Sequence, residues 1–575
     1  MHTDGISIAL IGCGPRGLNV LERLVACTPP QSHVTVHVIE RGELGVGTHR
    51  PDQPDYLVLH TACGYVSAFA APSTRGDSSR GPTLFEWARD HHVRVADGRN
   101  GDRPPLPTDH LPRSVLGRYL SWAARRIVAS ARCRIIHHRA VAETIDPLPM
   151  GPGESVRLDT GVRISVSTVI LTVGHHGVAA VSSADPAADP QRWIGAPYPL
   201  PNTVAGIPAE ATVAVVGSGL SAVDVIAALT VGRGGRYRTR GRRLDYLASG
   251  REPRIVLCSR SGLPARALPR LPDHPTERQP PRFLTPDAVA KLRTPRPRGE
   301  LDFDADVLPL VLAELEHRYA HAGGTELTGS LAEILFDAVP EYALADAAAF
   351  QKWYVTAIDE DLVEAEAGVD HSPLKYALEL FRDHLSVLRL IVDAPGLNEK
   401  SQEYFFRTFT AIINRLVIGP PAQRNLELSA LISCGILRLG PGPSPEISWD
   451  GDGWMVRSTR LAVPCGERAD FAIAAYLNPP TASVSENGIV RDLIAKGRLT
   501  ARTAGTLEIG STLTRAGNPV ARDGTTSRTL FVLGPLAEGS SYYNHYVTSP
   551  NSTSRAFADA TTVVEAVLDT TTART

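Results

Sequence analysis

The sequence predicts an α/β protein with two parallel sheets and an inserted helical domain. The first observation is a pair of short apolar runs, near residues 8 and 213, that each enter a glycine-rich turn followed by a helical pattern. The second is a stretch from about residue 280 to 440 in which apolar residues recur at helical spacing. The third is the return of short strand-like runs after that stretch. A chain of 575 residues is long enough for about three or four domains.

The first glycine-rich turn follows the apolar run Ile8–Ile11 and has the form G-x-G-x-x-G. Its first glycine permits a tight turn, its second lets a pyrophosphate approach, and its third lets helix and strand pack closely. The N-terminus of the next helix offers free N–H groups to that pyrophosphate. A second apolar run, 34–39, ends at an acidic residue that can accept hydrogen bonds from a ribose diol. The residues predicted to hold this dinucleotide are Gly12, Gly14, Pro15, Arg16, Gly17, Glu40 and Arg41.

The second turn follows the apolar run 213–216 and has the form G-x-G-x-x-A. The strand after it, 254–258, is followed by Ser259 and Arg260 rather than by a carboxylate. An arginine can pair with a 2′-phosphate, which a carboxylate would repel, so this site is predicted to prefer NADPH over NADH. The alternative is that Arg260 is a solvated loop residue. The residues predicted to bind this dinucleotide are Gly217, Ser218, Gly219, Leu220, Ser221, Ser259 and Arg260.

Two dinucleotides in one chain suit electron transfer from a nicotinamide to a flavin. The predicted fold is therefore α/β, with two Rossmann-like dinucleotide-binding domains for FAD and NADPH plus the inserted helical domain. The predicted boundaries are 1–205 for the first part of the FAD-binding domain, 206–279 for the NADPH-binding domain, 280–440 for a helical domain covering the substrate, and 441–575 for return strands and the C-terminal part of the two cofactor domains.

Several further elements can be placed from local patterns. We expect helices at about 84–91, 112–131 and 554–568, and a hairpin within 447–459. A strand that ends at Gly174-His175 should close the first part of the FAD-binding domain, and a later strand leading to Gly534-Pro535 should return to its sheet. All four of these residues are predicted to lie near the FAD. The arginine- and glycine-rich stretch 233–254 is predicted to be a solvated surface insertion.

Composition excludes several other classes of protein. The formal net charge of −2 implies neither nucleic acid nor a membrane surface as a partner. The seven cysteines are scattered and form no C-x-x-C motif, which argues against a disulfide framework or a metal site. We expect no secretory leader, and no apolar run approaches the roughly 20 residues that a membrane span needs. The expected location is the cytoplasm.

Several motifs together carry a resemblance that covers most of the chain. They are Ile11–Gly17, Arg50–Pro54, Leu59–Thr61, Gly174-His175, Ser259–Pro264 and Gly419–Pro421. This set resembles bacterial FAD/NAD(P)-binding proteins with a G-x-G-P-R-G fingerprint. Within that family the chain is similar to flavin-dependent aspartate N-monooxygenases, or nitrosuccinate synthases. One departure concerns His60, where many relatives carry Asn, and it affects the contacts expected near the flavin ring.

The resemblance implies an activity and its reactants. In similar enzymes NADPH reduces FAD, the reduced flavin reacts with O₂, and a neutral amine is oxidised, so no side-chain nucleophile and no metal are required. The implied substrate is a small amino acid, L-aspartate, and the implied setting is natural-product biosynthesis. His60 and Thr61 are expected near the flavin, and Thr61 is expected to contact flavin or substrate. A turn-capping role is the alternative for Thr61.

A substrate with two carboxylates should be bound by arginines, which pair with carboxylates through two hydrogen bonds. Four arginines in or beside the helical stretch are candidates: Arg266, Arg293, Arg415 and Arg424. Of these, Arg293 and Arg424 are selected as substrate ligands. Each arginine taken alone is more often a surface residue.

Other functions stay open at this point. The same scaffold serves N-hydroxylases of ornithine-type or other amines, and S-oxygenating or Baeyer–Villiger enzymes, although the signature of the last is missing. A non-catalytic redox sensor is a different class, but it needs only one dinucleotide site. The aromatic segment Ser540–Tyr546 is expected to line the site, with an ordinary loop as the alternative. The sequence leaves open whether the protein forms a homo-oligomer.

Overall fold

The computed structural model describes most of the chain. The described residues are 5–30, 32–71, 81–97, 101–174, 189, 191–272, 279–325, 329–476, 485, 487–544, 546–550 and 554–569. His175, which was expected near the FAD, lies outside them.

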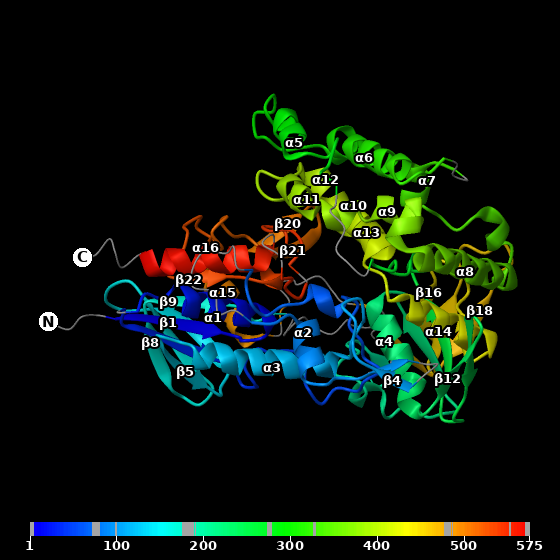
Figure 1. The fold of residues 1–575 in the computed structure, drawn as a ribbon, viewed down its shortest axis with the longest axis horizontal. Coiled ribbons are helices and arrows are strands. Elements are labelled where there is room, and N and C mark those ends of the chain that lie inside the picture. Colours follow the sequence, from blue (N-terminus) through cyan, green and yellow to red (C-terminus); the bar gives the residue numbers. More distant parts are fainter. Residues whose placement is uncertain are drawn as a thin grey trace.

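The first sheet has five parallel strands (Figure 1). In sheet order they are β22 (Leu530–Val532), β9 (Thr168–Leu171), β1 (Ile6–Ile11), β2 (Val34–Ile39) and β5 (Arg134–His138). β22 pairs with β9, so the chain returns to its first sheet about 360 residues later. The first domain is therefore discontinuous in sequence, because the position beside β9 is filled from the C-terminal part.

Each face of the first sheet is covered by a different layer. Helices α1 (Pro15–Cys27), α3 (Arg113–Ala129) and α16 (Arg555–Asp569) bury one face in a single hydrophobic core. The other face packs on an antiparallel sheet and on helix α15 (Gly488–Ala495). That sheet consists of β6 (Ala142–Pro147), β7 (Glu154–Leu158) and β8 (Arg163–Val166). Helix α2 (Leu84–Asp90) and hairpin β3–β4 (Val95–Asp97, Gly101–Arg103) lie in the connection between β2 and α3.

The second sheet repeats this plan. Its parallel strands are, in order, β10 (Trp193–Ile194), β19 (Phe471–Ala474), β11 (Thr212–Val216), β14 (Arg254–Cys258) and β15 (Leu437–Leu439). One face is covered by helices α4 (Leu220–Leu229), α8 (Ala347–His371) and α14 (Ala422–Ser433). The other face packs on the meander β16 (Glu446–Trp449), β17 (Trp454–Arg457) and β18 (Gly466–Ala469), where the predicted hairpin lies.

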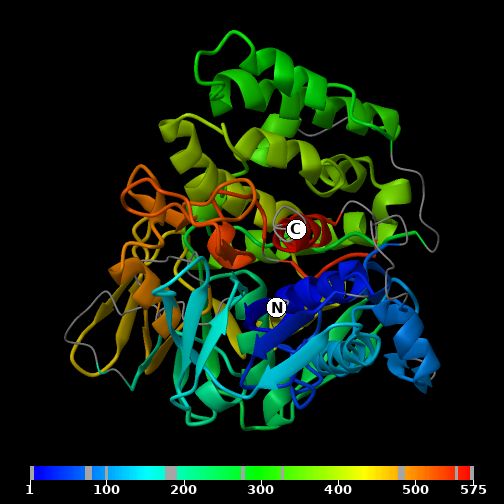
Figure 2. The same cartoon turned by 90° about the vertical axis from the view of Figure 1, so that its left-hand side faces the viewer.

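The helical domain has a core of its own and forms a layer on one side of the molecule (Figures 1 and 2). Its α-helices are α5 (Pro286–Arg293), α6 (Leu308–His321), α7 (Leu331–Leu335), α9 (Pro373–Leu378), α10 (Leu380–Asp383), α11 (Leu385–Val392), α12 (Glu399–Tyr404) and α13 (Thr410–Val417). Tyr542, from the C-terminal part, is buried in the same core.

In the structure, some segments belong to a different domain from the one that the sequence pattern predicted. β10 lies within 1–205 and β15 within 280–440, yet both are strands of the second sheet. α8 and α14 pack on that sheet although they lie in the helical stretch. The arginine-rich segment 233–254 contains a hairpin, β12 (Arg236–Arg240) with β13 (Arg243–Leu247). A short hairpin, β20 (Ala501–Ala504) with β21 (Leu507–Ser511), precedes β22. In the described part of the chain no helix is long and apolar enough to cross a membrane.

Candidate cofactor and substrate site

The first glycine-rich turn joins β1 to α1 in a conformation that depends on glycine. Gly12 has φ +82°, and a Cβ there would lie 2.8 Å from the carbonyl oxygen of Thr172. The N-cap of α1 is Gly14, which forms no side-chain capping hydrogen bond. The N-terminus of α1 is thus left for a ligand, as a pyrophosphate site requires.

Glu40 and Arg16 lie on either side of this turn. The Glu40 carboxylate accepts hydrogen bonds from the N–H groups of Cys13 and Gly42, each at 2.9 Å, which fixes it beside the turn. Arg16 Nη2 donates to the carbonyl oxygen of Asn544 at 3.1 Å, whereas its Nη1 is buried without a hydrogen-bond partner. A buried guanidinium nitrogen with no acceptor is costly, so this site fits the anionic pyrophosphate of FAD.

The strand ends that flank this turn carry the other predicted FAD contacts. Gly534 follows β22 with φ +88°, and a Cβ there would lie 3.4 Å from Cγ of Arg16. Pro535 is buried next to it. Gly174, after β9, has φ +67° and open space at its Cβ position. Arg41 is exposed.

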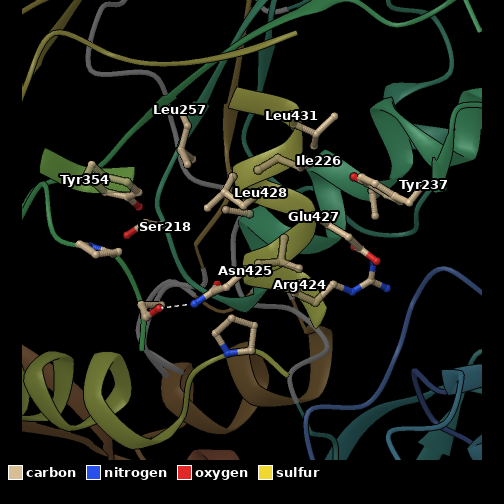
Figure 3. Close-up of a pocket in the computed structure, with 16 residues that line it drawn as sticks. Ser218, Ile226, Tyr237, Leu257, Tyr354, Arg424, Asn425, Glu427, Leu428 and Leu431 are labelled. Atoms are coloured by element: carbon tan, nitrogen blue, oxygen red, sulfur yellow. Dashed lines mark hydrogen bonds and ion pairs between the residues drawn. The ribbon is translucent and has the colours of Figure 1, made fainter. Parts of the chain in front are cut away.

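The second turn opens onto a cleft at the carboxyl ends of β11 and β14. Gly219 is exposed, and a Cβ there would meet no protein atom within 4 Å. Two pockets adjoin here, and Ser218, Leu257 and Tyr354 line both of them. Figure 3 shows the larger of the two. Ser259 lines the smaller one, whereas Arg260 is exposed. Leu220 and Ser221 begin α4, whose N-cap Gly219 forms no side-chain capping bond. The turn fits the pyrophosphate of a nicotinamide dinucleotide.

His60 and Thr61 lie on the extended segment between β2 and α3. Thr61 Oγ1 is 3.4 Å from His60 Nε2. Burial, with further contributions from Arg382 and Arg113, lowers the pKa of His60 to about 4. The imidazole is therefore neutral at physiological pH, and the cationic side chains of Arg382 and Arg113 lie near it.

The C-terminal aromatic segment is fixed by buried groups. Glu538 accepts hydrogen bonds from the N–H groups of Tyr543 at 2.7 Å and Asn544 at 2.9 Å, and burial raises its pKa to about 7. Arg389, from α11, donates to the carbonyl oxygen of Tyr543 at 3.2 Å. The ring of Tyr546 lies 5.4 Å from the guanidinium carbon of Arg16. The segment thus joins the first turn to the helical domain.

The two arginines selected from the sequence are engaged with the protein. Arg293 donates to four backbone carbonyl oxygens around α11, among them those of Leu390 at 2.7 Å and Gly396 at 3.1 Å. These contacts favour a structural role for Arg293. Arg424 lines the cleft, but its Nη1 lies 2.5 Å from the carboxylate of Glu427, and its Nη2 donates to the carbonyl oxygen of Tyr56.

The other two candidate arginines, Arg266 and Arg415, lie together. The N–H of Arg266 donates to the carbonyl oxygen of Arg415 at 2.9 Å, and Arg266 Nε is buried without an acceptor. Burial lowers the pKa of Arg415 to about 10, with Asp337 as its carboxylate neighbour at 3.5 Å. Arg382 donates to the carbonyl oxygen of Val417 at 2.6 Å and is near enough to His60 to lower its pKa. Arg382 therefore lies between His60 and helix α13, which carries Arg415.

Three charged residues of this region were not identified from the sequence. They are Asp361, Lys375 and Arg382. Each lies in a helical pattern in which a charged residue is normally solvent-facing, so position alone gave no signal. The one available hint was that Lys375 is one of only five lysines in an arginine-rich chain.

The two sheets, each with an open glycine-rich turn, define an α/β protein that binds two dinucleotides. Comparison with known proteins agrees: residues 9–176 match a family of FAD–NAD(P)-binding proteins. The chain is 32% identical over 562 residues to an L-aspartate N-monooxygenase (nitrosuccinate-forming) of Streptomyces davaonensis, covering 87% of this chain and 86% of that protein. It is 29% identical to the nitrosuccinic acid synthase of Aspergillus oryzae, covering 88% and 84%.

This chain belongs to the family of nitrosuccinate-forming L-aspartate N-monooxygenases. The sequence-based predictions of an α/β fold, of FAD and a nicotinamide dinucleotide as cofactors, and of a monooxygenase family are thereby confirmed. Among solved structures, an ornithine hydroxylase from Pseudomonas aeruginosa aligns over 98% of this chain and 99% of its own, with a TM-score of 0.43 and 10% identity, which is too distant to carry a functional argument.

Proposed function

We propose that this protein is a flavin-dependent monooxygenase that uses NADPH and O₂ to oxidise the amine of L-aspartate, with nitrosuccinate as the product. The observation that carries this proposal is the 32% identity to such an enzyme over 87% of the chain, together with two glycine-rich turns that remain open to dinucleotides. When bound, FAD supplies the redox chemistry, taking electrons from NADPH and passing them to O₂.

The residues of the chain bind and orient the reactants. The N-terminus of α1 and Arg16 would hold the pyrophosphate of FAD, and Glu40 its ribose. The N-terminus of α4, with Ser218 and Ser259 in the cleft, would hold NADPH. The helical domain would cover the reacting atoms and exclude water, which protects an oxygen-activating flavin from wasteful decay.

We place the two substrate carboxylates against Arg266 and Arg415 rather than against Arg293 and Arg424. Arg266 has a buried Nε without an acceptor, and Arg415 has a carboxylate no nearer than 3.5 Å. The N–H groups of Arg293 and Arg424 already donate to backbone carbonyl oxygens or to the carboxylate of Glu427. A carboxylate that paired with Arg266 and Arg415 would give the buried Nε of Arg266 an acceptor.

The test is the consumption of NADPH in air by the FAD-loaded protein with and without L-aspartate. We expect strong stimulation by L-aspartate and the appearance of nitrosuccinate or its decay product nitrite. Succinate, which has both carboxylates but no amine, is the matched control and should yield no nitrite. Stimulation by L-ornithine instead of L-aspartate would contradict the proposed substrate and favour an ornithine-type N-hydroxylase.

A further inference from the structure

The segment that carries Arg266 is held by two helices, α8 and α9. Ala267 N–H donates to Asp361 Oδ2 at 2.6 Å, and Arg270 N–H donates to the carbonyl oxygen of Ala365 at 2.8 Å, both on α8. From α9, Lys375 Nζ donates to the carbonyl oxygen of Ala267 at 2.8 Å. The backbone that follows Arg266 is therefore fixed, and its side chain is left to adapt.

One carboxylate, that of Asp361, serves two cations. Its Oδ1 lies 2.7 Å from Lys375 Nζ and 3.2 Å from Arg266 Nη1. Lys375 and Asp361 are both buried, so neither is satisfied by water. The shorter contact goes to the lysine, and Arg266 keeps a single long contact to the carboxylate together with a buried Nε that has no acceptor.

We propose that Lys375 is a positioning residue for substrate binding: by occupying Asp361 it keeps the guanidinium of Arg266 available for a substrate carboxylate. Without the lysine, the Asp361 carboxylate could form a bidentate ion pair with Arg266, which is the geometry that guanidinium and carboxylate groups prefer. This inference rests on the proposed function, in which Arg266 binds the substrate.

The charges of the surrounding residues support the inference. Four cations, Arg266, Lys375, Arg382 and Arg415, lie among three carboxylates, Asp361, Asp337 and Glu379. A buried excess of positive charge is unfavourable by itself and favours an anionic ligand. Lys375 contributes to that positive charge but does not itself bind the substrate, because its Nζ already donates hydrogen bonds to Asp361 and to the carbonyl oxygen of Ala267.

The experiment compares the steady-state kinetics of Lys375→Met and the unaltered holoenzyme, with L-aspartate as the varied substrate. We expect KM for L-aspartate to rise by about tenfold, equivalent to one charge-assisted hydrogen bond. We expect kcat at saturating L-aspartate to stay within about threefold, and KM for NADPH and the FAD content to be unchanged. Lys375→Arg, which keeps the charge, should restore most of the affinity. Lys496→Met, at an ion-paired lysine of the first domain, is the matched control and should have no effect.

A double variant separates positioning from general damage. Because Lys375 acts through Arg266, Arg266→Ala combined with Lys375→Met should have the same KM as Arg266→Ala alone. Additive effects, or an unchanged KM in folded Lys375→Met, would overturn the inference. If Arg266→Ala itself leaves KM unchanged, the substrate site proposed above fails instead. Should Lys375→Met not fold, Lys375→Gln, which is neutral but polar, takes its place with the same expected result.

Discussion

Whether an arginine can bind a substrate depends on what its N–H groups already contact. Arg293 and Arg424 lie where the sequence pattern suggested a site, but backbone carbonyls and Glu427 occupy them. Arg266 and Arg415 are less fully paired, and they adjoin each other through a backbone hydrogen bond. The difference is invisible in residue type, since all four side chains carry the same charge.

Arg260 offers a simple test of cofactor choice. It is exposed and follows Ser259, which lines the cleft beyond β14. We expect Arg260→Ala to lower the preference for NADPH over NADH by about tenfold, because one charge-assisted pair with the 2′-phosphate is lost. The ratio of kcat/KM for the two cofactors measures this. An unaltered ratio would show that Arg260 is a solvated loop residue, and Arg242→Ala, on the exposed hairpin, is the control.

The strand-turn-helix unit is the element that determines cofactor binding, and both copies share one design. In each, a parallel strand ends at a glycine-rich turn, and the next helix begins without a side-chain cap. The two copies differ in how tightly the protein packs on the turn. At the first glycine both copies are tight, because a Cβ would lie 2.8 Å from the carbonyl oxygen of Thr172 at Gly12 and 2.7 Å from that of Ala475 at Gly217. At the second glycine they differ: a Cβ at Gly14 would lie 3.3 Å from Cα of Gly47, whereas one at Gly219 would meet no protein atom within 4 Å.

That difference makes Gly219 a clean probe of NADPH binding. A Cβ at this position would meet no protein atom within 4 Å, so Gly219→Ala should leave the melting temperature and the FAD content unchanged. We expect KM for NADPH to rise by about tenfold or more, because the methyl group would occupy the space the pyrophosphate needs. Gly206→Ala, also in open space but away from the turns, is the control. An unchanged KM would place the dinucleotide elsewhere.

Across the whole molecule, the first two domains are joined by buried polar contacts. Arg113, on α3 of the first domain, lies 2.6 Å from Asp224 on α4 of the second, and Tyr198 donates to the same carboxylate at 2.6 Å. Leu57, from the segment that leads to His60, is part of the second domain's core. We expect these contacts to fix the distance between the two glycine-rich turns, on which hydride transfer between the cofactors would depend.

Arg113→Ala should therefore affect both stability and the reductive reaction. Removing one partner of a buried ion pair costs about 3–5 kcal/mol, so we expect a lower melting temperature. We also expect NADPH to reduce the bound flavin about tenfold more slowly, as measured by rapid mixing without oxygen. Arg113→Lys keeps the charge and should show a smaller change in both. A normal reduction rate in Arg113→Ala would mean that this contact does not set the cofactor distance.

The sequence by itself determined the two strand-turn-helix units of the dinucleotide-binding domains, the helical insertion and the returning C-terminal strand. These depend on local physics: a glycine-rich turn after an apolar strand has few alternatives, and hydrophobic periodicity is readable over short windows. The sequence also placed Glu40 and Arg16 beside the first turn, because both lie within about 30 residues of it.

Only the tertiary structure decided which strands share a sheet and which charges meet. β10 and β15 join the second sheet from outside its predicted range, since strand pairing is a long-range property. Lys375, Asp361 and Arg266 come from three separate segments, and their shared carboxylate appears only when α8 and α9 pack against the segment after β14. Local patterns fix what can bind a dinucleotide, whereas the availability of a charged side chain depends on neighbours that are distant in sequence.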